Sequence, residues 1–183
     1  YSDRRIPPAS MSKVMTAYLV FDYLKQGRAK LDDELPVSER AWRTGGSKMF
    51  VPLGGRIKIA DLVRGMVVQS GNDACVVLAE GLAGSEAAFI EQMNQKAKEI
   101  GLTNSNFANV DGLPDPNHWM TARDLATLAL RTIASNARRS VFLPISAMFV
   151  VLGLLFFALP KVTAYVFGVL CAWLAIGAIR KQV

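Results

Sequence analysis

A hydroxyl and an amine stand one helical turn apart near the start of the chain, in the sequence Ser10-Met11-Ser12-Lys13. Residues three apart on a helix lie side by side, with roughly 5 to 6 Å between their Cβ atoms, so the Lys13 amine can reach the Ser10 oxygen. The positive end of the helix dipole and burial both favour the neutral amine that a general base needs. The spacing therefore predicts that Ser10 is a nucleophile activated by Lys13.

Ser10 also has a purely structural interpretation, because serine is a preferred N-cap residue. A lysine in the first turn, however, has the wrong sign of charge for a helix chosen only for stability. The residues that follow, from Val14 to Leu24, are almost continuously apolar. This run predicts that the helix behind the pair is buried inside a domain.

A second polar motif, Ser70-Gly71-Asn72, lies between two predicted buried helices. A hydroxyl and a carboxamide on a tight turn can contact both a substrate amide and the Ser10/Lys13 pair, and Gly71 permits the backbone geometry of such a turn. The alternative is that Asn72 caps the next helix. The combination of this tripeptide with Ser-x-x-Lys favours the catalytic interpretation, because it resembles the motif set of β-lactamases and penicillin-binding proteins.

The chain strongly resembles the D-alanyl-D-alanine carboxypeptidases, the low-molecular-mass penicillin-binding proteins that trim peptidoglycan stem peptides. The resemblance covers residues 1 to about 133 and rests on landmarks that follow one another in order. These landmarks are Pro8–Thr16, Ala41–Ser47, Met49-Phe50, Leu62–Met66, Gln69–Ala74, Gly112-Leu113 and Thr121–Ala126.

The resemblance implies that Ser10 is acylated and that Lys13 is its base. It assigns a proton relay to Ser70 and contact with the substrate amide to Asn72 and Gly71. The implied partner is a peptidoglycan stem peptide ending in D-Ala-D-Ala, β-lactams would acylate the same serine, and no cofactor is involved. The implied fold class is α+β and mostly helical, a partial β-lactamase/DD-peptidase-like domain that lacks most of its sheet.

The sequence departs from this family where the sheet should be. The family's opening strands do not precede the Ser10 helix, and no Lys-Thr-Gly follows Ala126. Arg43-Thr44-Gly45 is an alternative to that third motif, but it precedes Ser70 and already matches another family segment. Two hypotheses therefore stay open. The chain is a serine D-Ala-D-Ala carboxypeptidase impaired by truncation, or an inactive membrane-anchored protein that at most binds wall peptides or β-lactams.

The positive charge of the chain is concentrated near its end. Residues 1–135 hold 16 Lys and Arg against 15 Asp and Glu, whereas residues 136–183 hold five basic residues and no acid. Because the first part is nearly balanced and has no basic stripe interleaved with aromatics, a nucleic-acid-binding domain is excluded. The two cysteines, Cys75 and Cys171, suggest no disulfide framework. We predict that the single histidine, His118, is a solvated or hydrogen-bonded loop residue, and we predict no metal site.

Two stretches near the end of the chain, residues 141–159 and 162–179, contain no charge. Each is close to the roughly 20 residues that cross a bilayer core as a helix. A buried hairpin of a soluble protein is the alternative, but two uncharged stretches this long are rare in soluble folds. We therefore predict a partial carboxypeptidase domain over residues 1–135 and a two-helix transmembrane hairpin in residues 136–183, with the lipid bilayer as its partner.

The charges of the chain and the family resemblance predict opposite sides of the membrane for the domain. Arg138 and Arg139 precede the first stretch, and Arg180 and Lys181 follow the second, so the positive-inside rule places both ends in the cytoplasm. The family resemblance instead implies a bacterial inner-membrane protein with its domain on the periplasmic side. This combination is typical of a fusion between unrelated pieces.

The remaining segments predict helices and one hairpin. Residues 39–43 form a short helical candidate, and Ser85 and Thr121 are plausible starts of two further helices. Met49–Val51 and Arg56–Ile59 flank Gly54-Gly55, a pattern typical of a hairpin with a glycine turn.

Overall fold

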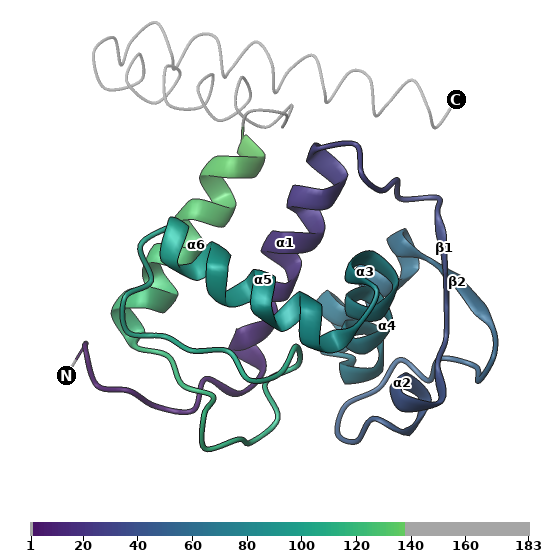
Figure 1. Ribbon diagram of the computed structural model, residues 1–183, viewed down its shortest axis with the longest axis horizontal. Helices are drawn as coiled ribbons and strands as arrows, with labels where there is room; N and C mark the ends of the chain where they lie inside the picture. The colour runs from purple at the N-terminus through teal and green to yellow at the C-terminus, as the bar shows by residue number, and fades with distance from the viewer. Residues whose placement is uncertain (1, 138–183) are drawn as a thin grey trace, which may run out of the picture. The chain divides into compact units, whose positions relative to one another are not determined.

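The computed structural model describes residues 2–137 of the chain (Figure 1). The two uncharged stretches that predict membrane crossing lie outside these residues. Within residues 2–137, none of the helices has the length and apolar character that crossing a membrane requires. The transmembrane hairpin and the domain boundary near residue 135 therefore stay predictions.

The described part is mostly helical, with a small sheet, as the family resemblance implies. Its elements are, in chain order, the 3₁₀ turn η1 (Ala9–Ser12), α1 (Lys13–Lys25), β1 (Glu34–Pro36), α2 (Glu39–Arg43), β2 (Arg56–Lys58), α3 (Ile59–Val68), α4 (Asn72–Ala83), α5 (Glu86–Glu99) and α6 (Ala122–Ala137). In Figure 1, α5 crosses in front of α1, with α3 and α4 to one side of α1 and α6 to the other.

Helix α4 is the centre of the core. It packs against α1, α2, α3, α5 and strand β1, and each residue from Ala74 to Ala79 is fully buried. This enclosure explains why its sequence is apolar on almost every side. Because α4 is held on all sides, the residues of its first turn, Asn72 and Asp73, have a fixed place relative to α1.

The predicted hairpin is wrong in one of its strands. Arg56–Lys58 is extended, but it pairs antiparallel with Glu34–Pro36, and Leu35 lies opposite Ile57. The strand Arg56–Lys58 and the glycine turn before it form as predicted, with Gly54 at a φ of +70°. Leu35 is almost completely buried, so packing of β1 against the core selects the partner of β2 in place of the nearer segment.

The segment that was predicted as the other strand is held by a buried carboxylate. The backbone amides of Met49 and Val51 donate to the two oxygens of Asp73 at 3.0 and 3.2 Å. Asp73 is completely buried and lies in the first turn of α4, where the helix dipole favours a negative charge. A side chain thus satisfies the amides that a neighbouring strand would otherwise satisfy.

The predicted helix starts are confirmed. The Ser85 hydroxyl accepts the Ala88 amide N–H at 3.1 Å at the start of α5. The Thr121 hydroxyl accepts the Asp124 amide N–H, also at 3.1 Å, at the start of α6. Asp124 does not complete a capping box, because its carboxylate accepts hydrogen bonds from Asn104 and Ser105. It therefore joins α6 to the loop after α5.

Candidate active site

Ser10 and Lys13 lie together at the start of α1. The Lys13 Nζ donates to the Ser10 Oγ at 3.2 Å and to the backbone carbonyl of Asp111 at 2.6 Å. Lys13 is 6% exposed, whereas Ser10 faces solvent. The N-cap positions of η1 and α1 are Pro8 and Ser12. The alternative of Ser10 as an N-cap is therefore wrong, and its hydroxyl caps neither η1 nor α1.

A loop far along the sequence fixes this pair in place. Thr16, one turn after Lys13 on α1, donates its hydroxyl to the Val110 carbonyl at 2.6 Å. Two side chains of α1 therefore hold two successive carbonyls of the loop, those of Val110 and Asp111. Because Lys13 is bonded on both sides, its amine has a defined position beside Ser10.

The same loop contacts the backbone just before Ser10. Ala9 has a φ of +50°, a left-handed conformation that a non-glycine residue rarely adopts. Gly112, at a φ of +85°, lies directly against it, and a Cβ placed on Gly112 would overlap the Ala9 carbonyl. A glycine is thus required at position 112 both by the backbone angle and by the contact.

The Ser70-Gly71-Asn72 turn joins α3 to α4, and its geometry differs from the prediction. Gly71 has a φ of −62°, which any residue adopts, and the left-handed residue is Ser70, with a φ of +56°. Space around Gly71 is tight, because a Cβ there would lie 3.0 Å from Asp73 Oδ1 and 3.2 Å from the Met49 nitrogen. Within the described part of the chain, the Ser70 Oγ is buried without a hydrogen-bond partner.

Asn72 is the first residue of α4, and it does not cap the helix. The N-cap position belongs to Gly71, and the Asn72 Nδ2 donates to the Gly45 carbonyl at 2.8 Å. The alternative that Asn72 is a helix cap is therefore wrong. Asn72 is 5% exposed, and this hydrogen bond joins its side chain to the loop after α2.

Arg43-Thr44-Gly45 does not form a strand. Arg43 ends helix α2, and Thr44 is the C-cap residue, whose hydroxyl donates to the Arg40 carbonyl at 3.0 Å. Because Gly45 receives the Asn72 side chain, this segment supports the Ser70-Gly71-Asn72 turn. It does not supply the strand of a third motif.

Residues 111–113 connect the two halves of the candidate site. Asp111 holds Lys13, and Gly112 touches Ala9. A Cβ placed on Gly46 would touch both the Leu113 side chain and the Asn72 carboxamide. Ser70 and Asn72 form no hydrogen bond with Ser10 or Lys13 among the residues that the structure describes, so the two halves are linked through Gly46 and this loop and not by a direct bond.

The described residues support neither a cysteine nucleophile nor a metal site. Burial raises the pKa of the Cys75 thiol far above its usual value, so Cys75 is an inert core residue and not a nucleophile. Residues 2–137 also hold no group of three or more His, Cys, Asp or Glu side chains that could bind a metal ion.

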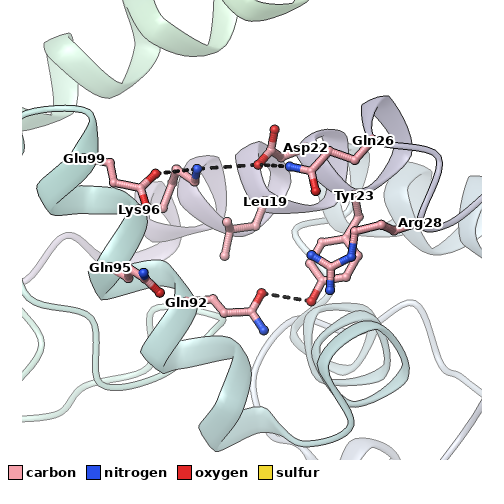
Figure 2. A pocket seen from close by; sticks show the side chains of 9 residues that line it. All are labelled: Leu19, Asp22, Tyr23, Gln26, Arg28, Gln92, Gln95, Lys96 and Glu99. Atoms are coloured by element: carbon pink, nitrogen blue, oxygen red, sulfur yellow. Dashed lines mark hydrogen bonds and ion pairs between the residues drawn. The ribbon is translucent and has the colours of Figure 1, made fainter.

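A hollow of about 270 Å³ lies between α1 and α5, away from Ser10 (Figure 2). Its polar side chains pair mainly with one another. Lys96 contacts Asp22 at 3.6 Å and Glu99 at 2.6 Å, and the Tyr23 hydroxyl donates to Gln92 at 2.9 Å. No serine, cysteine or histidine lines it, so we do not assign the chemistry to this hollow.

The described part of the chain matches part of the penicillin-binding protein fold. The crystal structure of the D-alanyl-D-alanine carboxypeptidase DacD from Francisella tularensis matches with a TM-score of 0.71 and 48% identity, over 72% of this chain and 32% of that chain. Penicillin-Binding Protein D2 from Listeria monocytogenes, in its ampicillin-bound form, matches with a TM-score of 0.65 and 28% identity, over 74% of this chain and 55% of that chain.

The sequence comparisons define the family more narrowly. The D-alanyl-D-alanine carboxypeptidase family model matches residues 1–142. The D-alanyl-D-alanine carboxypeptidase DacC of Escherichia coli is 45% identical over 133 residues, which are 69% of this chain and 33% of the relative. The chain belongs to the D-alanyl-D-alanine carboxypeptidase family. It spans about a third of the length of the curated relatives it matches.

Proposed function

We propose that this chain carries the acylation site of a serine-type D-Ala-D-Ala carboxypeptidase, with Ser10 as the nucleophile. The observation that carries the proposal is the contact of 3.2 Å between the buried Lys13 amine and the exposed Ser10 hydroxyl. The family match supports the reaction class, and the ampicillin-bound relative supports β-lactams as ligands. The substrate class is a peptidoglycan stem peptide that ends in D-Ala-D-Ala.

Each group at the site has a role in this proposal. Lys13 takes the proton of Ser10 as the Ser10 Oγ attacks the carbonyl carbon of the penultimate residue, and the backbone N–H of Ser10 is one donor of the oxyanion hole. Ser70, whose buried hydroxyl has no hydrogen-bond partner among residues 2–137, relays a proton to the departing D-alanine nitrogen. Asn72 contacts the substrate amide, and water then hydrolyses the acyl-enzyme.

The experiment that tests this function is covalent labelling. The purified chain is incubated with a fluorescent penicillin and digested, and the modified peptide is identified by mass spectrometry. We expect the adduct on Ser10, no adduct in Ser10→Ala, and normal labelling in Ser85→Ala, a serine that only caps α5. Labelling that survives Ser10→Ala contradicts the assignment. A folded chain that is never labelled supports the alternative of an inactive protein.

We also propose that residues 136–183 anchor the chain in the bacterial inner membrane. The support is the pair of uncharged stretches and the absence of acidic residues from this part of the sequence. In this proposal the family's substrate requires the domain on the periplasmic side. We expect the chain to stay with the membrane fraction during extraction with alkaline carbonate, and its release into the supernatant would contradict the anchor.

Replacing Gly112 by alanine should slow the acylation of Ser10 about tenfold or more. The new Cβ would displace the Ala9 carbonyl and the serine that follows it, and backbone strain of this kind costs about 1 to 3 kcal/mol. Gly84→Ala is the matched control, because Gly84 has a similar φ of +83° but nothing within 4 Å of its Cβ position. Equal labelling rates in the two variants would show that the contact with Ala9 is unimportant.

A further inference from the structure

The sequence predicts that His118 is a solvated or hydrogen-bonded loop residue, and in the structure it is hydrogen-bonded and not solvated. It is 3% exposed and lies in the loop between α5 and α6. Its ring meets the edge of Phe107 at 89°, with 5.7 Å between the ring centroids. Both of its ring nitrogens form hydrogen bonds, one to the loop and one to the turn that carries Ser10.

The hydrogen bonds determine which ring nitrogen carries the proton. The backbone amides of Ala108 and Asn109 both donate to Nδ1, at 3.1 and 3.3 Å. Nδ1 must therefore be an acceptor, and the proton of the neutral ring is on Nε2. That nitrogen lies 2.7 Å from the Ser12 Oγ, so the histidine donates to the serine.

The chain of hydrogen bonds continues to the residue before the nucleophile. Because Ser12 accepts from His118, its own hydroxyl hydrogen is directed to the Ala9 carbonyl, at 2.9 Å. This is the same carbonyl that lies against Gly112. Two contacts from the distant loop thus meet at the peptide between Ala9 and Ser10. Ala9 itself has the unfavourable left-handed φ.

We infer that His118 is a positioning residue for the nucleophile: through Ser12 it holds the Ala9–Ser10 peptide in its strained conformation and so keeps the Ser10 hydroxyl beside Lys13. The inference rests on the proposed function of Ser10. Without the hydrogen bond from His118, the Ser12 hydroxyl can rotate away from Ala9, and the turn can relax toward ordinary backbone angles.

The arrangement requires the neutral ring, which makes it sensitive to pH. Protonated His118 would place an N–H at Nδ1 against the two amides that donate to it. Burial lowers the pKa of His118, while the nearby carboxylates of Asp111 and Asp115 act in the opposite direction with smaller effect. Since the folded pKa lies below the unfolded value of about 6.5, the ring stabilises the fold fully above that pH. The stabilisation is lost as pH falls from about 6.5 through the folded pKa.

The hydrogen-bond network can be observed directly, because the chain has one histidine. In the full chain, solubilised in detergent and labelled with ¹⁵N-histidine, we expect an Nε2–H tautomer at pH 7.5 with a slowly exchanging proton. The ring should titrate below about pH 6.5, and Ser12→Ala should speed exchange of that proton and shift the amide signals of Ala9 and Ser10. An Nδ1–H tautomer, or a ring that titrates at the ordinary value, would overturn the inference.

The effect on the nucleophile is measured by the rate of labelling with a fluorescent penicillin between pH 5 and 8. We expect His118→Ala and Ser12→Ala each to lower the rate at pH 7.5 about tenfold, and the double variant to lower it no further, because the residues act through one chain of contacts. His118→Gln, which can donate to Ser12 but does not titrate, should recover most of the rate. Its ratio to the wild-type rate should rise as pH falls.

The control for a general loosening of the loop is Asn106→Ala, which removes a hydrogen bond to the Asn117 carbonyl in the same loop. It should leave the labelling rate unchanged. A rate in His118→Ala equal to that of the wild type would overturn the positioning role. If the wild-type chain is not labelled on Ser10 at all, the proposed function fails, whereas the tautomer and the amide shifts of Ala9 and Ser10 still decide whether His118 holds the turn.

Discussion

Replacing Lys13 by methionine should slow the acylation of Ser10 by a fluorescent penicillin about 100- to 10,000-fold, the range that a general base contributes. Lys13 is the side chain that contacts the Ser10 hydroxyl in the described structure, and methionine cannot accept its proton. Methionine is similarly long and unbranched, so it can fill the buried site with little loss of packing. The loss of rate should therefore exceed any loss of stability.

The substitution also removes the donor to the Asp111 carbonyl. A buried acceptor without a partner costs about 1 to 3 kcal/mol, so thermal unfolding must be measured beside the labelling rate. Lys25→Met is the matched control, because Lys25 is an exposed residue at the other end of the same helix. It should change neither quantity. A Lys13→Met rate within about tenfold of the wild-type rate would mean that another group takes the proton.

The local parts of the site could be predicted from the sequence. The contact between Ser10 and Lys13 follows from helical spacing alone. The sequence also predicts a buried helix after Ser70-Gly71-Asn72, and this helix is α4. Both depend on residues that are near in the chain. The same is true of the hydroxyl groups of Ser85 and Thr121, which begin helices as their positions predict.

The contacts that support the site could not be predicted in the same way. His118 lies 106 residues from Ser12 and Asp111 lies 98 residues from Lys13, and no spacing rule connects residues so far apart. The error in the hairpin has the same origin, since burial of Leu35 decides the strand pairing. One signal was present: Gly112-Leu113 is among the family landmarks, and glycine is the residue used where one backbone approaches another closely.

The 183-residue chain should release D-alanine from a diacetyl-Lys-D-Ala-D-Ala peptide far more slowly than a full-length member of its family. The family resemblance implies that the Lys-Thr-Gly strand binds the substrate carboxylate and supplies part of the oxyanion hole, and this sequence contains no Lys-Thr-Gly. Loss of one oxyanion donor costs about 100- to 1000-fold in rate. Loss of the carboxylate contact also removes the positioning of the scissile bond, so the two effects should compound.

The described structure gives a second reason to expect slow turnover. Residues 2–137 contain one sheet of two strands, with three residues in each, and catalytic groups need a supporting shell that holds them within about 0.5 Å. Here Ser10 is supported on one side by the loop that contains Asp111 and Gly112. The covalent step with a strained β-lactam should therefore survive better than hydrolysis of a peptide.

The measurement is D-alanine release by the detergent-solubilised chain, with the full-length Escherichia coli relative for comparison and Ser10→Ala as the background. A rate near that of the full-length enzyme would refute the prediction and show that another segment replaces the missing motif. Arg43 is the first residue to test, because Gly45, two residues on, binds the Asn72 side chain at 2.8 Å. Its guanidinium pairs with Glu39 on the exposed face of α2 at 2.7 Å, and a weak surface pair of this kind leaves it available to a substrate carboxylate. Arg43→Ala should then abolish the unexpected activity, whereas Arg64→Ala, which removes a similar surface pair with Asp61 on α3, should not.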